Sequence, residues 1–191
     1  GKPQEEKPTV VDETTNNTLV LNKDYTLSYS ANTTNVGTVT VTVTGKGNYT
    51  GIKTASYDIE AKSLNDTTID VGTIADVTYN GQSQKQEPVV KDTFRNVELT
   101  KGTDYDLEYS ADTTNQGTVT VTIKGKNNYK DNRDVTYKIN AQSFNDANSK
   151  ITVEKPADVY YDGTEKKQPI TVKDEATGVV LTPNTDYTLT Y

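Results

Sequence analysis

The chain has 191 residues, of which 31% are hydrophobic, and its formal net charge is −7 at pH 7. An acidic chain without a cluster of lysine and arginine repels nucleic acid and anionic lipid, so we expect neither nucleic acid nor a membrane among its partners. It contains no cysteine and no histidine, which excludes disulfides, thiolate metal sites and the commonest catalytic base.

In chain order, the first pattern to emerge is a repeat with an offset of 80 residues. Between Gly1–Lys62 and Gly81–Gln142, 29 of 62 positions are identical, and 14 of 29 positions in Gly163–Tyr191 match Gly81–Tyr109 at an offset of 82. A unit of this length is a small domain, because solenoid repeats run about 20–50 residues. We predict three tandem copies: a first repeat at 1–61 that lacks its opening strands, a complete second repeat at 62–141, and a third at 142–191 that is truncated at its C-terminus.

Within each copy, apolar residues alternate with polar residues in short runs, which is the pattern of half-buried β-strands. In the complete copy, these runs lie at 69–71, 75–79, 88–90, 97–99, 105–109, 119–123 and 135–139. Segments rich in glycine, asparagine and aspartate separate them and favour turns. The pattern predicts an all-β fold, either a β-sandwich or a small barrel, and a β-grasp-like repeat fits the same periodicity.

Tyrosine recurs with the repeat. Twelve of the 13 tyrosines occupy positions that are tyrosine in another copy, and Tyr160 is the exception. Tyr105 and Tyr109 alternate in phase with Leu107, so we expect the rings to pack in the core rather than form a sugar-binding platform. We expect their hydroxyls to reach polar partners at the rim of the core.

The junctions between copies are short. Ile59–Asp66 and Ile139–Asp146 occupy equivalent places, and about four residues separate the last predicted strand of one copy from the next copy. A linker this short does not behave as a flexible coil, so we expect adjacent repeats of the same chain to be partners in a restricted, end-to-end geometry. Leu64 and Phe144 are equivalent, and each is expected either at the contact between repeats or inside the following repeat.

Candidate catalytic and metal-binding residues all have simpler roles. Asp24, Asp104 and Asp186 recur directly before a strand tyrosine, where an aspartate most often caps a turn through the backbone. Asp131 and Asp134 offer oxygen ligands of the type that Ca²⁺ prefers, but their counterparts in the first copy are glycine and threonine. We therefore expect no catalytic residues, no metal and no cofactor, and we predict that the chain is not an enzyme.

An intramolecular crosslink between lysine and asparagine is a further possibility. It requires a buried lysine beside an asparagine and a carboxylic acid. Lys46 and Lys126 recur, but each lies in a glycine-flanked turn where solvent exposure is expected. We therefore expect no such crosslink at these lysines.

Several linked motifs in fixed order resemble a known class of repeat. They are Tyr79-Asn-Gly81, Lys101-Gly-Thr-Asp-Tyr105, Asn115-Gln-Gly-Thr-Val-Thr-Val-Thr122, Gly125-Lys-Asn-Asn-Tyr129 and Tyr161-Asp-Gly163. This pattern resembles the Ig-like tandem repeats, of the Tyr-Asp-Gly or MBG type, in cell-surface proteins and adhesins of Gram-positive bacteria. The resemblance implies Ig-like β-sandwich repeats, an extracellular location at the bacterial cell wall, anchorage through segments outside this chain, and no catalytic residues.

These observations lead to two hypotheses for function. In the first, the repeats are a stalk or spacer that projects a distal adhesive domain from the cell wall. In the second, the repeats themselves bind a host surface glycan or a matrix protein. The candidate binding residues are then Thr113, Thr114 and Asn115, in a loop that is nearly identical in the first two copies, because loops carry binding more often than strands do.

Overall fold

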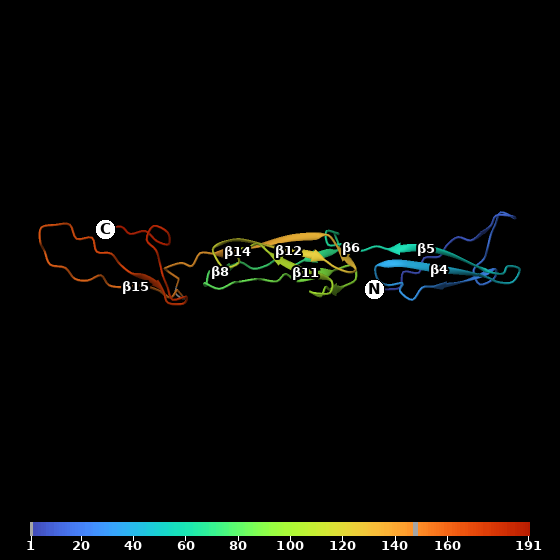
Figure 1. Ribbon diagram of the computed structural model, residues 1–191, viewed down its shortest axis with the longest axis horizontal. Coiled ribbons are helices and arrows are strands. Elements are labelled where there is room, and N and C mark those ends of the chain that lie inside the picture. The colour runs from blue at the N-terminus through green and yellow to red at the C-terminus, as the bar shows by residue number, and fades with distance from the viewer. Residues whose placement is uncertain (1, 147–148) are drawn as a thin grey trace. The chain divides into compact units, whose positions relative to one another are not determined.

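The computed structural model describes residues 2–146 and 149–191. In this part of the chain all regular secondary structure is β-strand, and no helix is found. The prediction of an all-β fold is therefore confirmed. The longest strands are β4 (Gly37–Gly45), β5 (Ile52–Ile59), β12 (Gly117–Gly125) and β14 (Asn132–Asn140), all of which are labelled in Figure 1.

Two groups of antiparallel strands form in the first copy. Besides β4 and β5 they comprise β1 (Val11–Asp12), β2 (Asn17–Thr18) and β3 (Tyr25–Tyr29). β1 and β2 form a short hairpin, and β4 lies between β3 and β5. Along β4, Val39 and Val41 are buried, whereas Thr38 and Thr40 are exposed. The alternation of the sequence thus becomes the two faces of a pleated sheet, and β-branched residues suit both faces.

The second copy contains more strands than the first. Besides β12 and β14 they are β6 (Lys62–Ser63), β7 (Ile69–Val71), β8 (Val77–Thr78), β9 (Val90–Asp92), β10 (Val97–Glu98), β11 (Tyr105–Tyr109) and β13 (Tyr129–Lys130). They form a three-stranded sheet in the order β10-β9-β7, a four-stranded sheet in the order β11-β12-β14-β8, and the pair β13-β6. Several short sheets in one copy are consistent with a β-sandwich.

Two of these pairings are parallel and involve the first and last strands of the copy. Tyr129 in β13 pairs with Lys62 in β6, and Ile139 in β14 pairs with Val77 in β8. The counterparts of β11, β12 and β14 in the first copy are β3, β4 and β5, which form a sheet of three strands. The sequence patterns predicted the strands but not which of them would pair.

Most of the buried hydrophobic residues of the second copy lie on alternate positions of its strands, and Leu64 and Leu99 directly follow a strand. The buried hydrophobic residues are Leu64, Ile69, Val90, Leu99, Tyr105, Val119, Val121, Ile123, Tyr129, Tyr137 and Ile139, all at most 5% exposed. The equivalent residues Leu64 and Phe144 differ in burial, because Leu64 is 1% exposed whereas Phe144 is 46% exposed.

The third copy has three strands among its described residues. They are β15 (Ile151–Val153), β16 (Val172–Asp174) and β17 (Val179–Val180), which form an antiparallel sheet in that order. Val172 and Asp174 are buried. Tyr160 and Tyr161 are 95% exposed and Tyr191 is 72% exposed, so the expectation that the recurring tyrosines pack in the core fails at Tyr161 and Tyr191. The segment of Tyr161 pairs with no other strand, and its ring therefore has no sheet face to cover.

One hairpin occurs in all three copies with the same turn. β1 pairs with β2, β9 with β10, and β16 with β17, each with four residues between the strands. The last turn residue has a positive φ in every copy: 56° at Asn16, 54° at Asn96 and 75° at Gly178. Only asparagine, aspartate and glycine adopt this conformation readily, which explains why the sequence varies only between asparagine and glycine there.

The recurring aspartates cap turns, as the sequence predicted. Asp24, Asp104 and Asp186 each accept a hydrogen bond at Oδ2 from the backbone N–H four residues earlier, at 2.8, 2.8 and 2.7 Å. This bond closes the loop that precedes the strand tyrosine. The same local interaction in three copies shows that these carboxylates are structural.

The tyrosine hydroxyls also have the partners expected at the rim of the core. Tyr29, Tyr109 and Tyr191 occupy equivalent positions, and each donates to a backbone carbonyl 23 residues earlier. Tyr137 donates to the carbonyl of Gln84 at 2.6 Å, and its counterpart Tyr57 donates to Gln4. These tyrosine tethers hold the irregular segment that precedes the hairpin against the sheet.

Residue contacts divide the chain into two compact units. One comprises Gly1–Thr73, Pro88–Glu108 and Thr122–Asp134, and the other comprises Ile74–Glu87, Tyr109–Val121 and Val135–Tyr191. The repeat boundaries after residues 61 and 141 stay a prediction.

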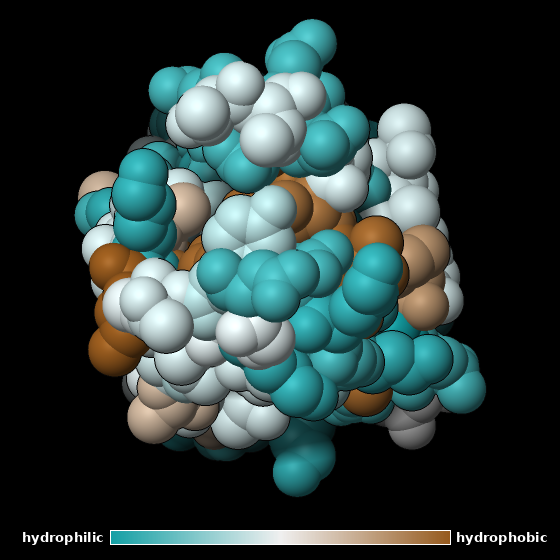
Figure 2. All heavy atoms as spheres, turned by 90° about the vertical axis from the view of Figure 1, so that its right-hand side faces the viewer, coloured by the Kyte–Doolittle hydropathy of each residue, from teal (hydrophilic) through white to brown (hydrophobic). Residues whose placement is uncertain are grey.

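Figure 2 shows one face of the molecule, on which hydrophilic residues cover most of the surface and hydrophobic residues form separate small areas, in keeping with the low mean hydropathy of −0.77.

Candidate functional site

The loop singled out by the sequence, Ser110–Gly117, is built around a single aspartate. Asp112 Oδ1 accepts hydrogen bonds from the backbone N–H groups of Thr114 and Asn115, at 2.8 and 2.9 Å. Its Oδ2 accepts a third from Asn115 Nδ2 at 2.7 Å. These bonds hold the pKa of Asp112 below its usual value. The bond from the Asn115 N–H lowers it most, followed by the bond from the Asn115 side chain and that from the Thr114 N–H. The carboxylate thus fixes the loop through its charged form.

The three candidate binding residues are therefore not equivalent. Thr113 is buried, with 7% of its surface exposed, Thr114 is half-buried and Asn115 is exposed. The Thr113 hydroxyl lies 2.8 Å from that of Ser83, and its carbonyl accepts the N–H of Gln84. Of the three side chains, only that of Asn115 is largely open to solvent.

A second polar cluster, which the sequence analysis did not single out, surrounds Asp92. This carboxylate has 0% relative exposure and contacts three other residues. Its Oδ1 lies 2.8 Å from Lys62 Nζ and accepts the backbone N–H of Arg95 at 3.2 Å. Its Oδ2 accepts the Tyr129 hydroxyl at 3.1 Å, and Tyr129 in turn accepts a bond from Arg95 at 2.9 Å. We call Lys62, Asp92, Arg95 and Tyr129 the Asp92 cluster.

Burial and charge act in opposite directions on this carboxyl. Removal from water would by itself raise the pKa of Asp92, but the hydrogen bond from Lys62, the Arg95 N–H, the charge of Lys62 and the Tyr129 hydroxyl outweigh it. The pKa of Asp92 therefore lies below its usual value. Burial also raises the pKa of Tyr129, against the positive charge of Arg95. The cluster is an ion pair with a neutral tyrosine.

The lysine of the cluster comes from the segment that joins two copies. β5 ends at Ile59 and β6 begins at Lys62, so only Glu60 and Ala61 lie between these strands. The Lys62 N–H donates to the carbonyl of Asn128 at 3.0 Å, and the Leu64 N–H donates to Lys130 at 2.9 Å. Together with the ion pair to Asp92, these bonds fix the chain to the second copy immediately after it leaves the first.

The counterparts of Asp92 show that the copies differ here. Asp12 in the first copy accepts bonds from Thr15 and from the Tyr49 hydroxyl, and it is half-buried. Asp174 in the third copy is buried and accepts the Ala176 N–H at 2.9 Å. Since glutamine stands at 142, where the second copy has Lys62, the third copy does not have this lysine. In each copy an aspartate follows two residues after a valine, so both side chains lie on the same face of the strand. This recurring pair is the sequence pattern that could have indicated a buried aspartate.

The chemistry of the Asp92 cluster is that of a structural ion pair. Condensation of lysine and aspartate to an amide with loss of water needs a neutral amine and a neutral acid. The lowered pKa of Asp92 keeps its carboxylate ionised beside the ammonium. The two lysines considered for a crosslink lie elsewhere: Lys46 Nζ donates to the carbonyl of Asn22, and Lys126 Nζ donates to that of Gly102.

The described residues hold no group of three or more histidine, cysteine, aspartate or glutamate side chains placed to bind a metal ion. Asp134, a candidate oxygen ligand, accepts the Thr122 hydroxyl at 2.6 Å, and Asp131 lies in a turn with φ of 69°. No helix in the described part of the chain has the length and apolar character to span a membrane.

Comparison with known proteins returned no relative. No protein-family model, no curated protein and no solved structure matches this chain.

Proposed function

We propose that this chain is a series of Ig-like spacer repeats from a bacterial cell-wall-anchored surface protein, in which the repeats project a distal adhesive domain. The observation that carries the proposal is the way consecutive copies are joined. Two residues separate β5 from β6, and the residues of β6 are bound at once to the second copy through Asn128, Lys130 and Asp92. A spacer needs such joints, because a long flexible linker would let the distal domain fall back.

The strand pairing of the second copy suits a protein that bears tension. Its first strand, β6, is parallel to β13, and β8 is parallel to its last strand, β14. When the two ends of a domain are pulled apart, a terminal strand that runs parallel to its partner is loaded along its length, so the hydrogen bonds of the pair must break together. This pairing favours a load-bearing role for each copy.

Composition supports the same function. The outward positions of β4 are threonines, as are those of β12 apart from Lys124, and threonine keeps the strand propensity without exposing much hydrocarbon. A net charge of −7 makes copies repel one another and repel an anionic cell wall. Both features favour an extended chain outside the cell.

One specific observation favours the second hypothesis, that the repeats bind a host glycan or protein. Phe94 is 81% exposed on the turn between β9 and β10, next to Arg95. Aromatic and arginine side chains dominate the energy of many binding surfaces. The counterparts of Phe94 are Thr14 and Ala176, so such a surface would belong to the second copy alone.

Small-angle X-ray scattering tests the spacer function. We expect the maximum dimension to grow by about 30 Å when one complete repeat is added to the chain, as strands of nine residues at about 3.3 Å each require. A dimension that does not grow with repeat number would overturn the proposal. Saturable binding of a host glycan or matrix protein, lost on Phe94→Ala or on alanine substitution of Thr113–Asn115, would favour the binding hypothesis instead.

A further inference from the structure

The loop of the first copy that corresponds to the candidate binding loop makes a contact that suggests another use. In this loop, Ser30–Gly37, Asn32 Oδ1 accepts the N–H groups of Thr34 and Asn35, at 3.2 and 3.0 Å. It thus has the same internal scaffold as the loop built on Asp112. The scaffold orients the two residues that follow, Asn35 and Val36.

Both of these residues bind one side chain of the second copy. The Val36 N–H donates to Asn128 Oδ1 at 2.9 Å, and Asn128 Nδ2 donates to Asn35 Oδ1 at 2.9 Å. The amide of Asn128 therefore uses its acceptor and its donor at the same time. This two-point contact is selective for an amide, because neither a carboxylate nor an alkyl side chain of the same size offers both groups.

Asn128 also holds the linker. Its carbonyl accepts the Lys62 N–H at 3.0 Å, so its backbone binds the linker while its side chain binds the loop of the preceding copy. Next to it, Lys130 Nζ lies 3.8 Å from the Glu60 carboxylate. One residue thus connects the three parts of the junction: the preceding loop, the linker and the turn of the following copy.

The turn that presents Asn128 is itself fixed. Asn127 has a φ of 54°, and its Nδ2 donates to the carbonyl of Thr103 at 2.8 Å. At Gly125, a Cβ would lie 2.8 Å from the backbone nitrogen of Lys130, so only glycine fits where the turn folds back. A rigid turn that faces a rigid loop loses little conformational entropy on contact, which favours docking.

We propose that the loop before each Gly-Thr-Val-Thr strand is a docking surface whose partner is the asparagine turn of the following repeat. In the second copy, Asn115 then binds the next repeat rather than a host ligand. In agreement, Asn115 and Gln116 line an open groove together with Thr177 and Val179 of the third copy. The inference rests on the proposed spacer function, to which docking adds stiffness at each joint.

Distances between two spin labels test this docking in the full chain. Because the chain has no cysteine, Ser56→Cys and Thr136→Cys, two exposed equivalent positions, can be labelled without side reactions. We expect a narrow distance distribution for the otherwise unchanged chain and a width increased about twofold by Asn128→Ala, which removes both hydrogen bonds of the contact and frees the joint. Asn35→Ala removes one of the two bonds and should increase the width by a smaller amount. The matched controls are Asn48→Ala and Asn115→Ala, the equivalent changes in the other copy, which should leave the width unchanged.

A double variant tests whether the two asparagines act on the same contact. The double variant Asn35→Ala with Asn128→Ala should be no broader than Asn128→Ala alone, because Asn128→Ala already removes both bonds of the contact. A broad distribution in the unchanged chain, or equal widths for Asn128→Ala and Asn48→Ala, would overturn the inference. In either case the scattering experiment still decides the spacer function, since the two-residue joint between β5 and β6 restricts the copies without the Asn128 contact.

Discussion

The ammonium of Lys62 lies 2.8 Å from the Oδ1 of Asp92, whose surface is completely buried. The lysine belongs to the linker that follows the first copy, and the aspartate ends a strand of the second copy. Without the lysine, the aspartate would be a buried charge that lacks its counter-ion. The ion pair therefore connects the joint between copies to the stability of the second copy.

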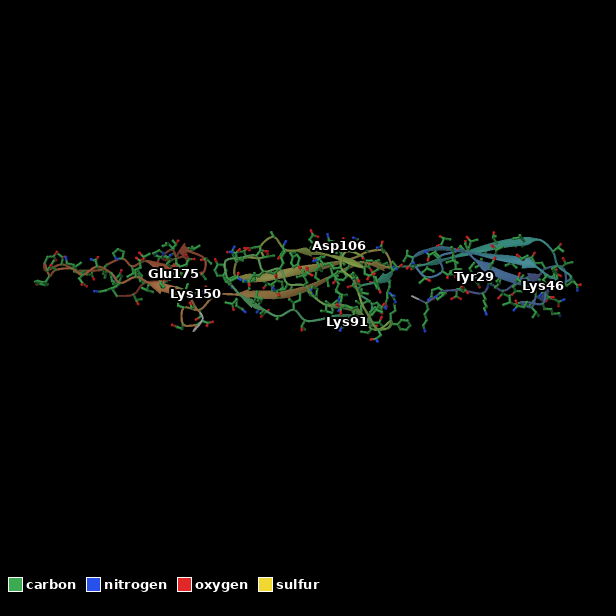
Figure 3. All side chains as sticks on the ribbon, turned by 90° about the horizontal axis from the view of Figure 1, so that it is seen from below. Tyr29, Lys46, Lys91, Asp106, Lys150 and Glu175 are labelled. Carbon is green, nitrogen blue, oxygen red and sulfur yellow. The ribbon has the colours of Figure 1, made fainter. Side chains whose placement is uncertain are left out.

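Replacing Lys62 with alanine should strongly destabilise the second copy. We expect a loss of about 3 kcal/mol in the free energy of opening, because one partner of a buried ion pair is removed. Amide hydrogen exchange of the second copy measures it. The matched control is Lys91→Val, since Lys91 is exposed at the margin of the ribbon in Figure 3 and the first copy has valine there. Equal protection in the two variants would show that the ion pair contributes nothing.

The stability that Asp92 provides should depend on pH. Because its pKa is lowered in the folded state, the unfolded state binds more protons at acid pH, and stability falls as the pH falls. The contribution is complete above the unfolded pKa of about 3.9 and declines below it. We expect the difference in unfolding free energy between the unchanged chain and Asp92→Asn to shrink below about pH 4. Asp92→Asn leaves every other carboxylate in place, so the difference between the two proteins isolates Asp92. A difference that is constant between pH 7 and acid pH would contradict this.

The aspartate scaffold of the loop should tolerate asparagine but not alanine. Asp112→Asn keeps an oxygen that accepts the N–H groups of Thr114 and Asn115, as Asn32 does in the first copy. Asp112→Ala removes it, and we expect a lower unfolding midpoint, because the side-chain cap of the loop backbone is lost. Thermal unfolding of the three proteins at one pH measures the order. Equal midpoints for the alanine and asparagine variants would refute the scaffold.

The hydroxyl of a tyrosine tether should stabilise the fold in addition to the burial of its ring. Tyr137→Phe keeps the buried ring and loses the bond to the Gln84 carbonyl at 2.6 Å. We expect a loss of about 1–2 kcal/mol, because the Gln84 carbonyl loses its shorter hydrogen bond and the Gln86 N–H loses its acceptor. Tyr160→Phe is the control, since Tyr160 is 95% exposed. Chemical denaturation of both variants compares them, and an unchanged midpoint for Tyr137→Phe would show that water replaces the hydroxyl.

Glycine should be required at the end of β12. Gly125→Ala would place a Cβ 2.8–2.9 Å from backbone atoms of Lys130, which cannot move as a side chain could. We expect a loss of about 1–3 kcal/mol from overpacking, together with weaker docking of Asn128. The nuclear magnetic resonance spectrum reports both: signals of Lys126–Lys130 should shift, whereas Gly72→Ala, whose added Cβ would make only an ordinary contact at 3.5 Å with the Val89 carbonyl oxygen, should leave this turn unchanged. Unshifted turn signals in Gly125→Ala would show that the turn has room for a side chain.

The sequence by itself determined the repeat, the all-β fold, the alternation of Val39 and Thr40 between two faces, and the aspartates that cap turns at positions 24, 104 and 186. All of these depend on neighbours within a few residues, and the pleat of a strand or the closure of a turn imposes them locally. The tertiary structure alone decided that β8 is parallel to β14, that Lys62 reaches Asp92, and that Asn128 binds Asn35. These partners lie 30 to 93 residues apart. A lysine, an aspartate or an asparagine has the same local pattern whether it faces solvent or a partner, because the folded chain, and not the strand, chooses which polar groups meet.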